Sequence, residues 1–198
     1  MLFDALAAET VRRVREFTPQ NLANTAWAFA TAGYTAPALF DALAAEAARR
    51  VREFTPQNLA NTAWAFATAG RSAPALFDAI AAEAARHVRD FNPQGLANTA
   101  WAFATAGHAA PALFDAIAAE APRRVLRDFK PQELANMAWA FATVGHTAPA
   151  LFDALAAETA RRVGEFKPQE LTNIAWAFAA ADYLLMEASL LDKSSAHH

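Results

Sequence analysis

The sequence predicts an all-α protein, a right-handed α-solenoid of tandem helix-turn-helix repeats of about 37 residues. The tryptophans stand at positions 27, 64, 101, 139 and 176, so they recur every 37 or 38 residues. The segment TPQNLANTAWAFATAG begins at Thr18, returns unchanged at Thr55 and returns three more times with small edits. Alanine, the strongest helix former, supplies much of a composition that is 55% hydrophobic. The composition therefore favours close-packed helices.

The first helix of each unit has clear start and stop signals. Thr18 is a predicted N-cap, Pro19 suits the first helical position, and Gly33 closes the helix about four turns later. Because helical side chains recur every 3.6 residues, one stripe of this helix should face the core. That stripe consists of Leu22, Ala26, Phe29 and Ala30.

The second helix of each unit is predicted to start near Ala36 and Pro37 and to run through LFDALAAEAARRVRE. Its last turn is rich in arginine, which suits the negative end of the helix dipole. Pro56 begins the next unit. The predicted buried stripe of this second helix consists of Phe40, Leu43, Ala44, Ala47 and Val51.

Neither helix can bury its stripe alone, so the chain should form one continuous stacked array rather than separate domains. The predicted units span residues 1–16 (partial), 17–53, 54–90, 91–128, 129–165 and 166–192, with a frayed tail at 193–198. Leu126 is an extra residue that a loop should absorb. In the last unit, LMEASLLD from Leu185 to Asp192 is expected to form a separate closing helix with Asp182 as N-cap. The chain begins in mid-repeat, so we expect a fragment of a longer array, without a targeting peptide.

Composition excludes several classes of function. The net charge of −3 and the pI near 5.9 give no bulk electrostatic reason to bind nucleic acid, so such binding would need a local patch. Cysteine is absent, which excludes disulfides and thiolate metal sites. No apolar run approaches the ~18 residues of a membrane span. The chain shows no catalytic constellation, and His108 and His146 stand one unit apart, too far to share a metal ion. We therefore expect a soluble non-enzyme without cofactor or metal.

The repeated unit F-x-P-Q-x-L-A-N-x-A-W-A-F-A-T-x-G, followed by P-A-L-F-D-A, runs through residues 17–41, 54–78, 91–115 and 129–153, and partly through 166–179. It resembles the octotricopeptide-like and heptatricopeptide-like repeats of organellar proteins in algae and protists. The resemblance implies a helical-repeat RNA binder of plastid or mitochondrial gene expression. Members often carry a C-terminal RAP-type domain, and this chain has none.

One first-turn slot varies among the copies while the inner faces barely change. Its side chains could distinguish base edges, as single-base repeat readers do. Alternatively, a first-turn position tolerates polar residues, with acids favoured by the helix dipole. The slot holds Asn21, Asn58, Gly95, Glu133 and Glu170.

A second slot never varies, although mid-helix asparagine is unfavourable by propensity. Its amide could bond the sugar–phosphate chain of RNA or a peptide backbone, or it could bridge neighbouring helices. On a helical wheel, Asn21, Asn24, Ala28 and Thr31 form a strip opposite the buried stripe, which we expect to line the concave groove. The constant asparagines are Asn24, Asn61, Asn98, Asn136 and Asn173.

The tryptophans lie at the edge of the predicted buried stripe. An exposed row of indoles would form a stacking platform for bases. An alanine-rich core, however, needs large side chains to fill the spaces between units, so we expect packing.

Arginines recur beside the N-terminus of each following helix, where cations and positive helix ends could form a track for phosphates. The alternative is a salt-bridged surface, since Glu46–Arg50, Glu9–Arg13, Glu120–Arg124 and Glu158–Arg162 are favourable i,i+4 pairs. The predicted phosphate contacts are Arg49, Arg52, Arg86, Arg89, Arg124 and Arg127.

The leading hypothesis is thus a non-enzymatic array that binds single-stranded RNA in its groove. The acidic pI and the constant asparagines support a second hypothesis, a protein-interaction scaffold of the armadillo or HEAT type.

Overall fold

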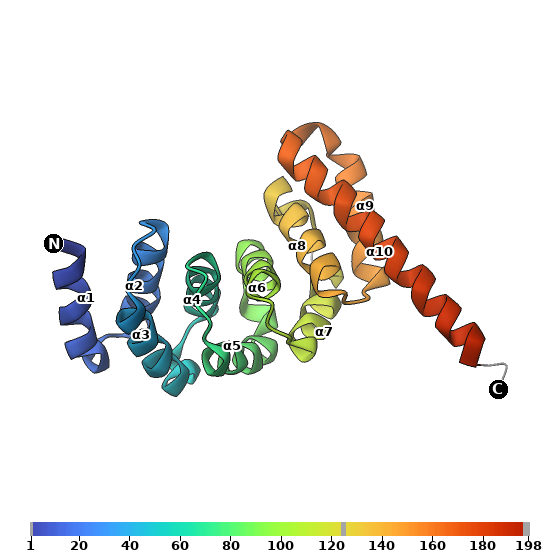
Figure 1. Cartoon of the computed structure of the whole chain (residues 1–198). Helices are drawn as coiled ribbons and strands as arrows, with labels where there is room; N and C mark the ends of the chain where they lie inside the picture. Colours follow the sequence, from blue (N-terminus) through green and yellow to red (C-terminus); the bar gives the residue numbers. More distant parts are fainter. Residues whose placement is uncertain (1, 124–125, 196–198) are drawn as a thin grey trace.

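The computed structural model describes residues 2–123 and 126–195, with side chains described up to residue 181. It is an all-α helical-repeat solenoid, as predicted (Figure 1). We call the first helix of each unit the A helix and the second the B helix. The A helices are α2 (Pro19–Thr31), α4 (Pro56–Thr68), α6 (Pro93–Ala106), α8 (Pro131–Val144) and α10 (Pro168–Ser195). The B helices are α1 (Leu2–Arg13), α3 (Pro37–Arg49), α5 (Pro74–Arg86), α7 (Pro111–Glu120) and α9 (Pro149–Arg161).

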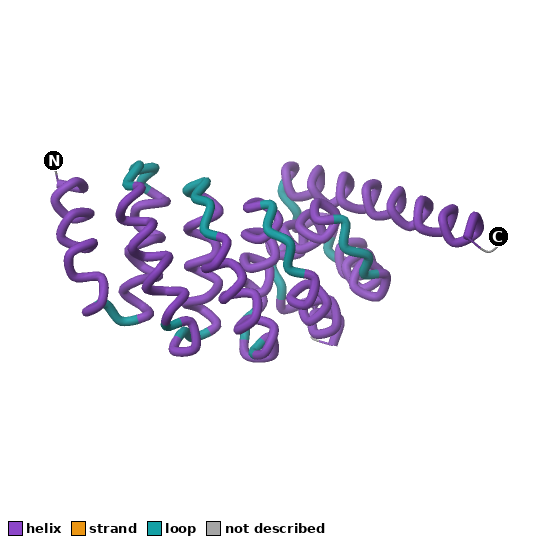
Figure 2. Tube along the Cα trace, turned by 60° about the horizontal axis from the view of Figure 1, so that its bottom comes forward, coloured by secondary structure: helices purple, strands orange, loops and turns teal. Residues whose placement is uncertain are grey.

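The A helices stand side by side and make the most extensive contacts in the molecule, α2 with α4, α4 with α6, α6 with α8 and α8 with α10. The B helices form a second layer (Figure 2). Short 3₁₀ turns connect each one to the next unit. Among the described helices, none is long and apolar enough to cross a membrane. The 3₁₀ turns are Val14–Glu16, Val51–Glu53, Val88–Asp90, Ala121–Arg123, Leu126–Asp128 and Val163–Glu165.

The predicted start and stop signals of the A helices are confirmed. The Thr18 hydroxyl accepts a hydrogen bond from the backbone N–H of Asn21 at 3.1 Å, and α2 begins at Pro19. Gly33 has φ +63°, a left-handed conformation that glycine adopts without steric cost, and the chain turns there into α3. The predicted inner stripe of α2 is buried in full, and Phe40, Leu43 and Ala47 of α3 are buried against it.

The insertion near Leu126 is absorbed beyond the end of a helix, but its side chain is buried and does not lie in an exposed loop. Pro122 cannot donate a backbone hydrogen bond and its ring clashes with the preceding turn, so α7 ends at Glu120, earlier than the other B helices. The chain then continues through 3₁₀ turns on either side of residues 124–125.

The expected separate closing helix is wrong, because α10 continues as one helix from Pro168 to Ser195. The reason lies in two substitutions. Asp182 stands where the other units have the left-handed glycine, and Met186 stands where they have the proline that starts the B helix. With neither signal present, nothing interrupts the helical backbone at this point.

Thr62 and Thr99 occupy a buried slot between neighbouring A helices, and their hydroxyls have no hydrogen-bond partner. The later units place Met137 and Ile174 in this slot, both buried. An apolar side chain therefore suits the position better than an unpaired hydroxyl.

We predict that Thr99→Val raises the free energy of unfolding by about 1 kcal/mol, because it replaces an unpaired buried hydroxyl with a methyl group of similar size. Urea denaturation monitored by circular dichroism measures this directly. Thr105→Val, at an exposed position of the same helix, is the matched control. An unchanged or lower stability in Thr99→Val would show that the hydroxyl is satisfied.

Candidate nucleic-acid interface

Each internal A helix is covered on three sides, by the preceding A helix, the following A helix and the B layer. In α4 this leaves one narrow open strip, formed by Gln57, Asn61, Trp64 and Thr68. Gln57 and Thr68 are exposed, and Asn61 and Trp64 are half-buried. The same residue types recur in the other units, so we call the set the A-face strip. Its further members are Gln20, Asn24, Trp27, Thr31, Gln94, Asn98, Trp101, Thr105, Gln132, Asn136, Trp139, Thr143, Gln169, Asn173 and Trp176.

The exposure predicted for the groove strip holds in α2, where Asn21, Asn24, Ala28 and Thr31 are all exposed, but it is wrong for the internal units. There the slot of Ala28 is fully buried, at Ala65, Ala102 and Ala140. A single-helix wheel placed this alanine opposite the core. In the array the neighbouring A helix packs on it, because a small side chain lets two helices approach closely.

The tryptophans are only partly packed, so the expectation of a packing role holds in part. Trp64, Trp101 and Trp139 contact the core and remain half-buried, while Trp27 and Trp176 are each 48% exposed. The ring centroids of Trp64 and Trp101 are 6.4 Å apart with an interplanar angle of 30°. Trp64 and Trp101 thus form a partly open aromatic pair across α4 and α6.

The constant asparagines lie between these indoles and the glutamines of the strip. Asn24 is exposed and the other four are half-buried. In the described part of the chain, none of their side-chain amides has a hydrogen bond to another protein group, and no bridge to a neighbouring helix is present. The amide donors and acceptors are thus available to a ligand at the surface.

The side chains of the variable first-turn slot lie beside the strip. Four of them accept a hydrogen bond from the backbone N–H of the N-cap residue of their own helix. Asn21 Oδ1 accepts from the backbone N–H of Thr18 at 3.1 Å, and Glu133 Oε2 accepts from that of Lys130 at 2.8 Å. Asn58 and Glu170 make the same bond, to Thr55 at 3.2 Å and to Lys167 at 2.8 Å.

In the third unit the slot is glycine and only half of this cap is present, since Asn92 Oδ1 accepts from the N–H of Gly95 at 2.7 Å, as the Thr18 hydroxyl does from Asn21. The N-cap and the slot therefore vary as a pair, as a reciprocal cap requires. Gly95 and Glu133 are buried, contrary to the exposure expected for this slot. A base-reading role for the slot stays a prediction.

The arginine edge contains both paired and unpaired cations. Arg49 lies 2.6 Å from Glu46, Arg86 lies 3.7 Å from Glu83, and Arg89 lies 3.7 Å from Glu120. Arg124, another predicted phosphate contact, lies outside the described residues.

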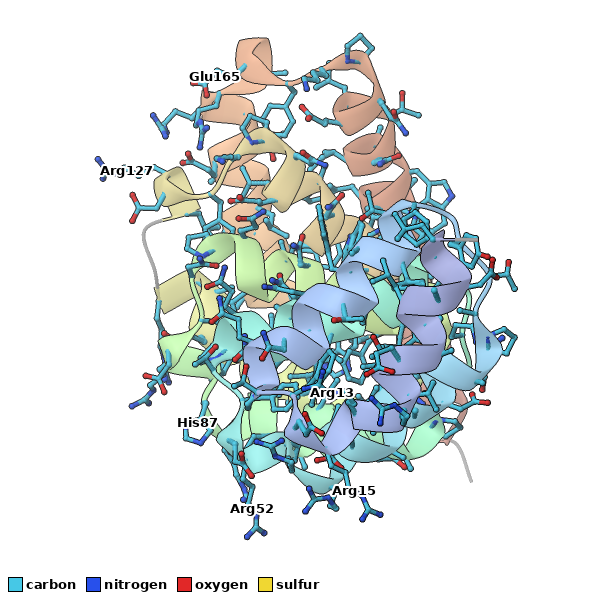
Figure 3. The ribbon with its side chains drawn as sticks, turned by 90° about the vertical axis from the view of Figure 1, so that its left-hand side faces the viewer. Arg13, Arg15, Arg52, His87, Arg127 and Glu165 are labelled. Carbon is cyan, nitrogen blue, oxygen red and sulfur yellow. The ribbon has the colours of Figure 1, made fainter. Side chains whose placement is uncertain are left out.

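Several arginines on the 3₁₀ turns differ from these, among them Arg15, Arg52 and Arg127. Their side chains are exposed and extend away from the helices, and within the described chain they form no ion pair (Figure 3). Arg52 and Arg127 are predicted phosphate contacts, whereas Arg15 belongs to a recurring arginine cluster but is not among those predicted contacts.

Two other arginines connect neighbouring units by hydrogen bonds. Arg50 Nη1 donates to the carbonyl of Phe17 at 2.7 Å, and Arg162 Nη1 donates to that of Phe129 at 2.8 Å. The predicted i,i+4 pairs that support them are present at 3.5 Å for Glu46–Arg50 and 3.2 Å for Glu158–Arg162, with a third at 3.8 Å for Glu9–Arg13. Glu120–Arg124 falls outside the described residues.

The opposite edge carries contacts that sequence reasoning missed. There the first residue after each turn glycine binds an aspartate of the preceding unit, as His108 Nε2 does with Asp78 Oδ1 at 2.8 Å. The spacing of 30 residues between such pairs, or 31 between Asp115 and His146, was the available signal. No group of three His, Cys, Asp or Glu side chains in the described chain could hold a metal ion.

Together these features define a class, a helical-repeat protein with an open polar and aromatic face on its A layer. The chain matches the family described as RNA-editing substrate-binding complex 6 protein over residues 1–195 and belongs to that family. No curated protein matches the chain. Membership of the octotricopeptide-like and heptatricopeptide-like groups stays an expectation.

The ion pairs of Glu46 with Arg49 and Arg50 give a prediction about pH. The hydrogen bond from Arg49 lowers the pKa of the Glu46 carboxyl below its ordinary 4.5, so its ionised form stabilises the fold above pH 4.5. That contribution is lost as the pH falls through the lowered pKa of the folded protein. We expect wild type to lose about 1 kcal/mol more than Glu46→Gln between pH 6 and pH 3, an amount limited by the exposure of Arg49. Denaturant titrations across this range test it, and parallel pH curves would contradict it.

Proposed function

We propose that this chain is a non-enzymatic module that binds single-stranded RNA along its A-face strip. The name of its family refers to RNA-editing substrate binding, which makes RNA the first ligand to consider. The fold supports a binding role because the A helices stand side by side (Figure 1), so that the same residue types recur at regular intervals along one face.

The observation that carries the proposal is the combination of indole rings and free amides in the strip. Bases stack on aromatic side chains whatever their sequence, while amides can hydrogen-bond to base edges or to the sugar–phosphate chain. Trp64 and Trp101 are near neighbours across two units, and Asn61 and Asn98 lie one helical turn before them. A strand that crosses the A helices would therefore meet one set per unit.

The N-terminal ends of the A helices supply the electrostatic part of the proposal. Each end directs backbone N–H groups and the positive end of the helix dipole outward, beside the unpaired Arg15, Arg52 and Arg127. Since the whole chain has a net charge of −3, this attraction is local and should be weakened strongly by salt.

The ion pairs of Arg49, Arg86 and Arg89 favour the second hypothesis, a protein-interaction scaffold, because a neutralised edge attracts phosphate weakly. Titration of an RNA pool at low salt separates the two. Binding no stronger than that of an unrelated acidic protein would leave the scaffold as the function of this chain.

We predict that replacing Trp64 and Trp101 with leucine weakens RNA binding by about 1–3 kcal/mol for each stacked base, because leucine keeps apolar packing but removes the ring face. Fluorescence anisotropy with an unstructured labelled RNA measures the affinity. The double phenylalanine variant keeps an aromatic face and should retain most of the binding. Equal affinities of the leucine variant and wild type, with equal melting temperatures, would exclude the strip as the RNA site.

A second prediction concerns Arg52, which has no ion pair in the described chain. If its side chain contacts phosphate, Arg52→Ala should make the slope of log K against log salt shallower by about 0.7, the value for one single-strand contact. Arg49→Ala is the matched control and should change the slope less, since Glu46 already neutralises Arg49. Identical slopes for wild type and Arg52→Ala would assign Arg52 to a solvated surface.

A further inference from the structure

The turn between the A and B helices of each unit is held by a repeated arrangement that we call the turn socket. A socket consists of a phenylalanine and an aspartate from the B helix of one unit and a phenylalanine from the A helix of the following unit. It receives the residue that follows the turn glycine of that following unit. In the third unit the His108 ring lies 5.4 Å from Phe77 and 5.9 Å from Phe103, measured between centroids. Its Nε2 lies 2.8 Å from Asp78 Oδ1.

Four sockets are filled, and their occupants share one chemistry. Each is a planar side chain that can donate a hydrogen bond to the carboxylate, and three of the four can carry a positive charge. The tyrosine and the histidines also pack on the phenylalanine pair. The occupants and their aspartates are Tyr34 with Asp4, Arg71 with Asp41 at 3.4 Å, His108 with Asp78, and His146 with Asp115 at 3.1 Å.

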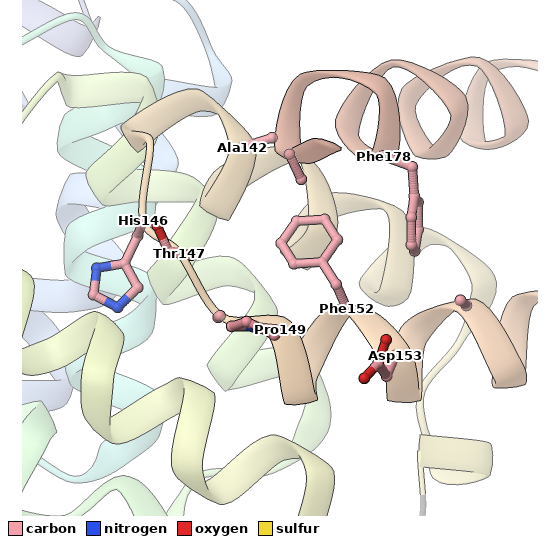
Figure 4. Close-up of a pocket in the computed structure, with 10 residues that line it drawn as sticks. Ala142, His146, Thr147, Pro149, Phe152, Asp153 and Phe178 are labelled. Carbon is pink, nitrogen blue, oxygen red and sulfur yellow. The ribbon is translucent and has the colours of Figure 1, made fainter. Parts of the chain in front are cut away.

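The fifth socket is assembled, but no described side chain fills it. Phe152 and Phe178 form the same edge-to-face pair, with centroids 5.2 Å apart, and Asp153 is exposed beside them. A cavity of about 290 Å³ lies here, lined by both rings and by Asp153 and Ala156 (Figure 4).

The third unit shows what is missing from this cavity. The corresponding hollow there, about 220 Å³, is lined by His108 and does not reach Asp78 or Ala81, the equivalents of Asp153 and Ala156. His108 is bonded to Asp78 there. The additional lining of the fifth cavity therefore lies where the turn residue binds in the third unit.

The backbone of α10 explains why no described turn residue fills the fifth socket. The other units deliver their turn residue through a left-handed glycine, whereas α10 continues as a helix through Asp182. Tyr183 follows Asp153 by 30 residues, the spacing of Tyr34 from Asp4, and its side chain lies outside the described ones.

We propose that the fifth socket is a docking site for a partner protein, which inserts a histidine, arginine or tyrosine from an exposed turn. The occupants of the four filled sockets define this chemistry, and the Asp153 carboxylate favours a donor or a cation over an acceptor. RNA fits poorly, because its phosphates would approach that carboxylate. A second copy also fits poorly, since its own described turn residues are already held by Asp4, Asp41, Asp78 and Asp115.

The probe is a fluorescent peptide with the sequence ATAGHAAPALF, which copies residues 104–114 and carries the histidine turn. We expect saturable binding to the full chain, and about tenfold weaker binding to Asp153→Asn, because a charge-assisted hydrogen bond is lost. The same peptide with alanine in place of histidine should bind equally weakly to wild type. Asp78→Asn is the matched control and should leave peptide binding unchanged, since His108 occupies that socket. Circular dichroism verifies that each variant is folded.

Three results would overturn the proposal. One is equal binding of the histidine and alanine peptides, or of wild type and Asp153→Asn. Another is binding that appears only in Tyr183→Ala, which would assign the socket to Tyr183 of the same chain. The third is displacement of the peptide by a single-stranded RNA. RNA affinity itself should be unchanged in Asp153→Asn, so failure of this proposal is distinct from failure of the RNA-binding proposal.

Discussion

The close side-by-side packing of the A helices is the constraint on which the rest of the structure depends. It is possible because alanine occupies the flanks of these helices, with Ala65, Ala102 and Ala140 fully buried at one recurring slot. Small side chains allow two helix backbones to approach closely, and the large rings of Phe66, Phe103 and their equivalents then fill the space toward the B layer. A bulky residue in the alanine slot would separate two units and open the core between them.

The same packing determines what is left for function. Two covered flanks and a covered back leave each A helix a strip about one side chain wide, so the exposed residues fall at i, i+4, i+7 and i+11, as Gln57, Asn61, Trp64 and Thr68 do. The repeat then aligns these strips into one surface. Residues outside it serve the array itself, as Arg50 does by binding the carbonyl of Phe17 in the preceding unit.

Local signals allowed the helices to be predicted from the sequence. Thr18, Pro19 and Gly33 act within their own helix, and the structure places the boundaries of α2 where they indicate. The candidate site was predicted less well, because its exposure depends on neighbours that a single-helix wheel omits. The wheel therefore predicted an exposed position for Ala28 and its equivalents, whereas the equivalents in the internal units are buried between helices. The wheel also gave no sign that the first-turn slot bonds to the N-cap residue three positions earlier. The sequence did carry that signal, since the pair Thr18 and Asn21 is replaced as a pair by Lys130 and Glu133.

The two ends of each strip meet different side chains. At one end lie the N-terminus of the A helix and the exposed Arg15, Arg52 and Arg127, which alternate with carboxylates such as Glu16 and Glu53. At the other end lie the C-terminus of the A helix and the socket aspartates, from Asp4 to Asp153. Each strip runs between these ends, with its glutamine nearest the arginines and its threonine nearest the aspartates. A bound polyanion would therefore place its phosphates over the glutamine end and direct its bases toward the indoles. The aspartate edge is electrostatically suited instead to donors and cations, so the proposed RNA surface and the proposed partner site lie apart on one small array.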